Sequence, residues 1–215
     1  NAGATYEIEQ SIRFNDNDSA YLTRTPGSAS NQKTWTLSGW VKRANLTTTQ
    51  IILSAWQDGS NHFQIGFADS GGSAADTIRV YGYASGFIFH YVTTQLFRDP
   101  SAWYHLVVAV DTTDGTAGDR VKIYVNGSQV TAFSTSVDPS VNTDTFVNKN
   151  IAHSLGRQGS GANYYDGYMA EINFVDGTQV AASSFGETNS ATGQWVPKEY
   201  EGSYGTNGFY LKGQD

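Results

Sequence analysis

Two short segments of the chain combine aromatic rings with clustered polar side chains. Sugar rings present apolar C–H faces that stack on aromatic side chains, while carboxylates and amides bind the sugar hydroxyls. The candidate ligand-binding residues are Trp56, Asp58 and Asn61 in the first segment, and Asn163, Tyr164, Tyr165 and Asp166 in the second. The alternative is a structural role, in which Trp56 ends a strand in the core, and Tyr164 and Tyr165 point one into the core and one to the surface.

Candidate metal ligands are sparse. The run Asn15-Asp16-Asn17-Asp18 is the densest group of the oxygen ligands that calcium prefers, and Asp58 and Asp166 are further candidates. The run lacks the glycine and the distal glutamate of an EF-hand loop, and turn chemistry alone explains Asn and Asp there. The four histidines lie in separate segments and the chain contains no cysteine. We therefore expect no metal site and no cofactor, with bound calcium as the alternative.

The elements that would position these residues are strands. Runs of β-branched and aromatic residues alternate with clusters of Gly, Asn, Asp, Ser and Thr, which is the pattern of strands joined by turns. The expected strands span residues 11–15, 20–24, 35–43, 50–56, 62–69, 77–84, 87–96, 103–111, 120–125 and 168–175. Their connectors are short, so neighbouring strands are expected to be antiparallel. Less than about a tenth of the chain is expected to be helical, since no long helical period with caps occurs.

Three positions refine this picture. Residues 106–110 are apolar on both faces of the expected strand, which indicates burial in the middle of a sandwich. Asn126-Gly127 supplies the two left-handed positions of a tight hairpin turn, and Asp176-Gly177 is expected to do the same. The whole pattern predicts an all-β fold.

Charge and hydropathy exclude several classes of partner. Thirteen basic and 20 acidic residues give a formal net charge of −7, and no basic cluster is longer than Lys42-Arg43. Phosphate backbones would be repelled, so nucleic-acid binding is not expected. The longest apolar run is far shorter than the roughly 18 residues that a membrane span needs. The chain begins at Asn1 without a signal-like segment, so we expect it to derive from a longer protein.

Four sequence segments occur in a familiar order. They are WTLSGWVK (35–42), AWYHLVVAVD (102–111), VKIYVNG (121–127) and DGYMAEINFVD (166–176). Together they resemble the concanavalin A-like lectin/glucanase superfamily in its laminin-G/pentraxin-like branch. The segments SIRFN (11–15), AYLTRTP (20–26) and GFYLK (208–212) are similar to modules in structural proteins of tailed phages, especially marine ones. The resemblance implies a two-sheet antiparallel jelly-roll sandwich, a fold that hosts lectins, hydrolases and adhesion modules alike.

The resemblance also raises the possibility of catalysis. Glu171-Ile-Asn173-Phe-Val-Asp176 looks like the Glu-x-Asp-x-x-Glu strand of the laminarinase-like glycosidases in this superfamily. A retaining glycosidase needs two carboxyls about 5–5.5 Å apart, one acting as nucleophile and the other as acid. Here Asn173 replaces the middle carboxylate, and Asp176 is one methylene shorter than glutamate and stands in an expected turn. We therefore expect no catalytic residues, and interpret this segment as the last core strand.

These observations divide the chain into three parts: an N-terminal extension (1–10), a jelly-roll domain (11–185) and an extended C-terminal segment (186–215) that packs on the domain or leads to another. We expect a non-catalytic recognition or display module of a virion or extracellular surface protein, such as a tail fibre, that binds carbohydrate or a host surface. Its partners would be glycans and other virion or surface proteins, and it would act in multiples within an assembly. Two alternatives stay open, a purely structural decoration or subunit-contact protein and a laminarinase-like glycosidase.

Overall fold

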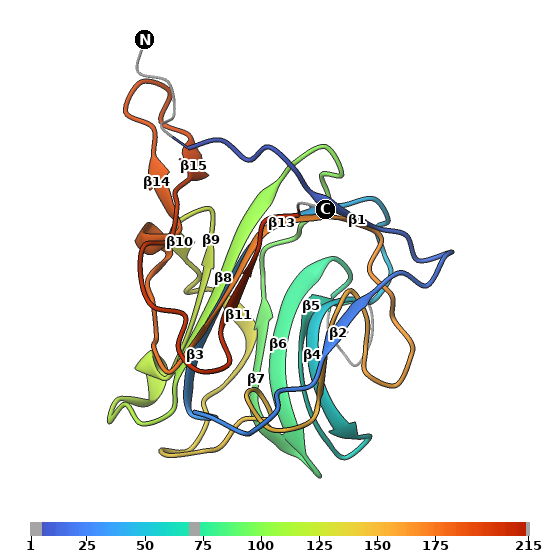
Figure 1. Cartoon of the computed structure of the whole chain (residues 1–215), viewed down its shortest axis with the longest axis vertical. Coiled ribbons are helices and arrows are strands. Elements are labelled where there is room, and N and C mark those ends of the chain that lie inside the picture. Colours follow the sequence, from blue (N-terminus) through green and yellow to red (C-terminus); the bar gives the residue numbers. More distant parts are fainter. Residues whose placement is uncertain (1–5, 69–73, 214–215) are drawn as a thin grey trace.

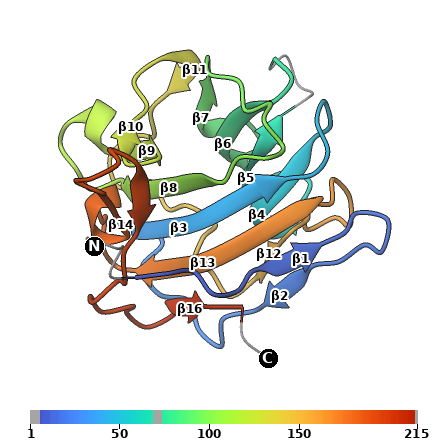
Figure 2. The ribbon, with the colours of Figure 1, turned by 90° about the horizontal axis from the view of Figure 1, so that it is seen from above.

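The computed structural model describes residues 6–68 and 74–213. Within them, two large antiparallel sheets pack face to face (Figures 1 and 2). Part of the expected N-terminal extension (1–5), Asp69 at the end of the expected strand 62–69, and the last two residues of the C-terminal segment lie outside the described residues. The all-β jelly-roll sandwich expected from the sequence is confirmed, with helix confined in the described part to the short 3-10 turns η1 (Ala117–Asp119) and η2 (Ala182–Ser184).

One sheet, called here the β3 sheet, contains the strand expected to be buried on both faces. In spatial order its strands are β1 (Ile12–Phe14), β13 (Gly167–Asp176), β3 (Thr34–Arg43), β8 (Tyr104–Asp111), β9 (Val121–Val125) and β10 (Ser128–Gln129), with β16 (Phe209–Leu211) also paired to β13. On β8, Val108 faces the main core while Val107 faces a second apolar cluster on the outer side. The Asn126-Gly127 turn is confirmed, since both residues have positive φ and join β9 to β10.

The other sheet, called here the β5 sheet, presents the face that matters for the candidate site. Its spatial order is β11 (Phe133–Val137), β7 (Phe87–Thr93), β6 (Thr77–Ala84), β5 (Asn61–Ala68), β4 (Gln50–Asp58), β12 (Ala152–Leu155) and β2 (Leu22–Arg24). On β5, Phe63, Ile65 and Phe67 point into the main core between the sheets. Because side chains alternate along a strand, His62 and Gln64 point to the outer side.

The C-terminal segment covers much of the outer side of the β3 sheet (Figure 1). It forms η2 and the hairpin of β14 (Gly186–Thr188) and β15 (Trp195–Pro197), and Phe185 packs there in a cluster with Val107 and Val175. The expectation of a strand hairpin at Asp176-Gly177 is wrong, because the chain leaves β13 at Gly177 and crosses to this outer cluster instead. Within residues 6–68 and 74–213, no helix has the length and hydropathy to cross a membrane.

Candidate functional site

An aromatic surface occupies the outer side of the β5 sheet. Trp56, His62 and Tyr83 stand on the neighbouring strands β4, β5 and β6 at directly paired positions, Trp56 opposite His62 and His62 opposite Tyr83. Their rings stack, with centroids 4.4 Å apart for Trp56 and His62 and 5.4 Å apart for His62 and Tyr83. Paired residues on one face of a sheet lie close enough for this contact. The result is a stack of three rings that runs across the strands, called here the aromatic ladder.

The surface continues beyond the aromatic ladder onto β7. Phe87 contacts Tyr83 edge-on with ring centroids 5.3 Å apart and stacks on His90 at 4.2 Å. Tyr81 contacts both of these rings edge-on, with centroids 5.6 Å from Phe87 and 5.9 Å from His90. Phe87 is 46% exposed, a large fraction for a phenylalanine held in a strand. An exposed group of aromatic side chains on an otherwise polar surface is typical of an interaction site.

A polar corner adjoins these rings. The Tyr81 hydroxyl donates to Gln64 Oε1 at 2.8 Å, and the Arg79 guanidinium lies 4.3 Å from the centre of the Tyr81 ring. Gln64 is only 3% exposed, and its Nε2 has no hydrogen-bond partner among the described residues. Gln64, Arg79 and Tyr81 line a small depression together with Gly66, where a Cβ atom would lie 2.3 Å from the Gln50 carbonyl oxygen. The corner therefore contains a buried amide donor that no described residue binds, and a buried donor without a partner is costly.

The two histidines of this surface are neutral near pH 7. Burial lowers the pKa of His62. Burial, together with the positive charge of Arg79, lowers the pKa of His90 to about 4. The Arg79 Nε–H donates to His90 Nε2 at 2.9 Å, which requires that nitrogen to be unprotonated. The imidazole rings are therefore uncharged, with the faces of His62 packed between Trp56 and Tyr83 and a face of His90 packed on Phe87, and Arg79 supplies the positive charge of the polar corner.

The first predicted loop lies at one end of the aromatic ladder. Trp56 is half-buried and belongs to the ladder itself. The Asp58 carboxylate is exposed and accepts hydrogen bonds from the Ser60 amide at 2.8 Å and from Asn61 Nδ2 at 3.0 Å. These hydrogen bonds lower the pKa of Asp58, so its carboxylate is ionised. Trp56, Asp58 and Asn61 are thus brought together as the sequence predicted, with Asp58 and Asn61 also closing the β4–β5 turn.

The second predicted loop does not form one site with the first. The ring of Tyr165 is fully buried against Phe14, and its hydroxyl donates to the Lys42 carbonyl oxygen at 2.9 Å. Asp166 is buried and forms an ion pair with Arg13 at 2.7 Å. The prediction that Tyr165 and Asp166 contact a ligand is therefore wrong, because both side chains are used to attach the start of β13 to the domain.

The remaining residues of that loop are accessible but separate. Asn163 is exposed, with its Nδ2 donating to Gln158 Oε1 at 2.6 Å. Tyr164 is half-buried and its ring lies 6.5 Å from that of Tyr21, near the edge strand β2. The loop reaches the aromatic ladder at Gly159, where a Cβ atom would lie 2.1 Å from Trp56 Cβ. The loop therefore supports Trp56 from one side.

The two carboxylates considered for catalysis lie on opposite sides of β13. Glu171 sits in a β-bulge with φ of 51°, and its carboxylate accepts hydrogen bonds from the hydroxyls of Tyr6 and Tyr210. The Asp176 carboxylate instead accepts from Asn148 Nδ2 at 2.8 Å and from the Asn207 amide at 2.9 Å. Asp176 pairs with the core residue Trp35, whereas the Tyr6 and Tyr210 hydroxyls reach Glu171 from the outer side. The two acids therefore do not face each other across a space that could hold a glycosidic bond.

The Asn/Asp run considered for calcium is a turn. Asp16 accepts from Asn45 Nδ2 at 3.1 Å through its carboxylate and from the Ser19 amide through its backbone. Asn15 donates to Asp18 at 2.6 Å. Within the part of the chain that the structure describes, no three His, Cys, Asp or Glu side chains gather in an arrangement that could hold a metal ion. The run therefore makes the contacts of a turn, although the buried Oδ1 of Asp16 has no hydrogen-bond partner among the described residues.

Most of the aromatic surface was missed by the sequence analysis. The residues added by the structure are His62, Gln64, Arg79, Tyr81, Tyr83, Phe87 and His90. The sequence did contain an indication of this surface, because Arg79, Tyr81 and Tyr83 occupy every second position of β6 and must share one face of the strand. The burial of the intervening residues Ile78 and Val80 makes that face the outer one. The cross-strand neighbours that complete the surface depend on sheet order, which the sequence does not reveal.

Solved structures of similar fold come from several kinds of protein. A Bacteroides ovatus protein provisionally described as carbohydrate binding matches with a TM-score of 0.58 and 18% identity over 79% of this chain. Domain 4 of an extracellular GH43 arabinanase from Geobacillus stearothermophilus, solved with arabinotriose, matches with a TM-score of 0.50 and 20% identity over 70% of the chain. Tailspike protein 2 of the Escherichia coli O157:H7 bacteriophage CAB120 matches with a TM-score of 0.53 and 10% identity over 81%.

At these identities the likeness shows the fold alone, and the chain spans 44%, 64% and 23%, respectively, of the three matched chains. No match is found among the curated proteins. The family comparison is specific, because residues 15–183 match the model of a laminin-G-like family described as the concanavalin A-like lectin/glucanases superfamily. The chain belongs to this superfamily, as the order of its strands and its four sequence segments indicated.

Proposed function

We propose that this chain is a non-catalytic carbohydrate-binding module whose ligand lies on the aromatic ladder. The observation that carries the proposal is the stack of Trp56, His62 and Tyr83 beside the unpartnered amide of Gln64. Aromatic faces stack on the apolar side of a sugar ring, and a buried amide donor binds a hydroxyl. The rings also stack on one another, whereas Gln64 Nε2 has no hydrogen-bond partner among the described residues. Each ring contact contributes roughly 1 kcal/mol beyond the area it buries.

The shape and charge of the surface favour a short stretch of a neutral glycan. The aromatic ladder covers three adjacent strands, so it extends over about 10 Å, given the usual spacing between strands. The exposed carboxylate of Asp58 lies near one end, and Arg79 lies near the other. An anionic sugar would be repelled at Asp58, and a cationic one at Arg79. A neutral oligosaccharide is repelled by neither side chain and forms hydrogen bonds with both Asp58 and Arg79.

Two of the similar structures support carbohydrate recognition. The similar domain of the Geobacillus stearothermophilus arabinanase was solved with arabinotriose, and the Bacteroides ovatus protein is described as carbohydrate binding. A sialidase from Streptococcus pneumoniae shares the fold as well, with a TM-score of 0.53. In the present chain, Glu171 and Asp176 point to opposite sides of β13, so the pair considered for hydrolysis cannot act on one bond.

We further propose that the module is displayed in several copies on a virion or another extracellular surface. The fold-level likeness to a phage tailspike supports this setting. A single site with two or three stacked rings gives weak affinity, and several linked copies raise the overall affinity without any new contact. Display on a surface would therefore suit a site of this size.

A glycan array followed by calorimetry tests the proposed site. The wild-type chain is expected to bind one class of neutral polysaccharide, and Trp56→Ala and Tyr83→Ala are each expected to weaken that binding several-fold. Tyr164→Ala is the matched control, since it removes an accessible aromatic ring that lies off the ladder. Equal binding by all four folded proteins would contradict the site. An absence of binding to every glycan would favour a purely structural role.

A further inference from the structure

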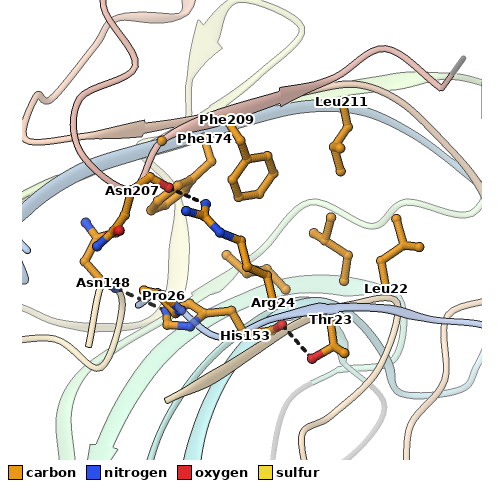
Figure 3. A pocket seen from close by; sticks show the side chains of 13 residues that line it. Leu22, Thr23, Arg24, Pro26, Asn148, His153, Phe174, Asn207, Phe209 and Leu211 are labelled. Atoms are coloured by element: carbon orange, nitrogen blue, oxygen red, sulfur yellow. Dashed lines mark hydrogen bonds between the residues drawn. The ribbon is translucent and has the colours of Figure 1, made fainter. Parts of the chain in front are cut away.

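A cleft opens between the edges of the two sheets, away from the aromatic ladder. It has a volume of about 440 Å³ and lies where β2 of the β5 sheet faces β16 and β13 of the β3 sheet (Figure 3). Figure 2 shows β2 and β16 along the same edge of the sandwich. Ligand pockets in proteins commonly measure about 300–1,000 Å³. The cleft is therefore large enough for a small molecule.

The walls of the cleft are mainly apolar. They are formed by Leu22, Leu53, Leu155, Phe174, Phe209 and Leu211. Leu53, Leu155 and Phe174 belong to the main core, so the cleft gives solvent a route to the core between the two sheets. Leu22 at the mouth is 40% exposed. Apolar surface that water can reach is covered favourably by an apolar ligand.

One positive charge stands at the end of this cleft. Arg24 extends from β2 toward the opposite sheet, where its Nη1 donates to the Asn207 carbonyl oxygen at 2.6 Å and its guanidinium lies 5.5 Å from the centre of the Phe209 ring (Figure 3). No carboxylate of the described residues lies within ion-pair distance of Arg24. Its charge is uncompensated by an ion pair in a chain whose formal net charge is −7.

None of the other described ionisable groups near the cleft provides an anionic partner for Arg24. The carboxylate of Asp176 is already bound by Asn148 Nδ2 and by the Asn207 amide. His153 lines the cleft, and burial is the main cause of its lowered pKa, so the ring is neutral near pH 7. The guanidinium of Arg24 thus remains the cationic group at the cleft, with donors left over from its contact with Asn207.

We propose that the cleft binds a small amphiphile that has an apolar tail and a single anionic head group. The tail lies between β2 and β16 against the leucine and phenylalanine side chains, and the head group pairs with the Arg24 guanidinium. Charge complementarity selects the anion, because arginine binds carboxylates and related groups through two parallel hydrogen bonds. The site is independent of the aromatic ladder, which lies on the outer side of β4, β5 and β6.

Calorimetric titration with dodecanoate and with dodecan-1-ol distinguishes the contribution of the apolar tail to binding from that of the head group. Both ligands are used below the concentration at which dodecanoate forms micelles. We expect the wild-type chain to bind one dodecanoate per chain more tightly than dodecan-1-ol. Arg24→Gln is expected to weaken dodecanoate binding about tenfold, the usual worth of a hydrogen bond to a charged group, while leaving dodecan-1-ol unchanged. Leu22→Trp fills the mouth and is expected to abolish binding of both.

Lys122→Gln is the control for net charge, since Lys122 carries a positive charge on β9, toward the opposite edge of the β3 sheet, and pairs with Asp119 in a partly buried ion pair. It is expected to bind dodecanoate as the wild-type chain does. Circular dichroism and thermal melting confirm that each variant is folded. The proposal is overturned if dodecanoate does not bind, if Arg24→Gln binds it as tightly as the wild-type chain, or if Lys122→Gln weakens it equally. Binding that survives Leu22→Trp in a folded protein also overturns it.

Discussion

Gly159 lies against Trp56 so closely that a Cβ atom at position 159 would be 2.1 Å from Trp56 Cβ. The loop between β12 and β13 therefore determines where the first ring of the aromatic ladder can lie. Gly159→Ala is expected to displace the Trp56 ring and weaken glycan binding several-fold, although residue 159 supplies no side chain to the ligand. Glycan titration and tryptophan fluorescence measure the two effects.

The control for this prediction is in the neighbouring turn. Gly59 has nothing within 4 Å of the position where its Cβ atom would stand, so Gly59→Ala is expected to leave both signals unchanged. Unaltered fluorescence and affinity in Gly159→Ala would show that the loop yields easily and does not position Trp56.

Hydrolysis is tested separately from binding. The wild-type chain is expected to release no reducing sugar from a β-glucan, because Glu171 and Asp176 lie on opposite sides of β13. Glu171→Gln is expected to retain glycan binding, since Glu171 lies on the other sheet from the aromatic ladder. Release of sugar by the wild-type chain that disappears in Glu171→Gln would make the protein a glycosidase.

Stability is expected to fall with acid below about pH 6.5, the ordinary pKa of histidine. Burial lowers the pKa of His90 to about 4 and also lowers the pKa values of His62 and His153. The unfolded chain then binds more protons than the folded one between these values, so stability is complete above pH 6.5 and is lost as the pH falls toward 4. Urea unfolding at pH 7 and pH 4.5 measures the loss. In His90→Gln, the fall in the free energy of unfolding between pH 7 and pH 4.5 is expected to be smaller by about 1–2 kcal/mol. A loss unchanged in His90→Gln would assign it to other groups.

Local sequence pattern predicted the long strands and the short strands β1 and β2, and it missed several other short strands. The apolar run at residues 106–110 and the Asn126-Gly127 turn fixed β8 and the β9–β10 hairpin, because burial on both faces and positive φ leave a direct mark on residue type. Strands such as β11, β12 and β16 carry no such mark. They are three to five residues long, and each pairs with a longer strand that is distant in the sequence.

The candidate site was predicted only where one loop contained it. Trp56, Asp58 and Asn61 lie within six residues and were identified together, whereas His62 and Tyr83 join Trp56 through strand pairing. Tyr165 was misassigned because two adjacent tyrosines at the start of a strand must point to opposite sides, and the sequence does not say which of them enters the core. Tyr165 is the one buried, through its contacts with Phe14 and Lys42.

The last prediction concerns Asp76, which connects the loops at one end of the sandwich. Its side chain is fully buried, and its carboxylate binds Arg43 at 2.9 Å, the Thr47 amide at 2.7 Å and Arg98 at 3.0 Å. Arg43 is fully buried as well, and its guanidinium lies 4.3 Å from the centre of the Phe67 ring. Removing one member of a buried ion pair leaves the other charge without compensation in the protein interior.

Asp76→Ala is therefore expected to lower the free energy of unfolding by about 3–5 kcal/mol. Arg98→Ala removes a partner of the same carboxylate whose own side chain is 55% exposed, so its loss is expected to be about 1 kcal/mol or less. Chemical unfolding of the two variants beside the wild-type chain measures both. Similar losses in the two variants would mean that Arg98 is the main partner of the Asp76 carboxylate. Arg43 would then be stabilised by the Phe67 ring and by the Phe97 carbonyl oxygen instead.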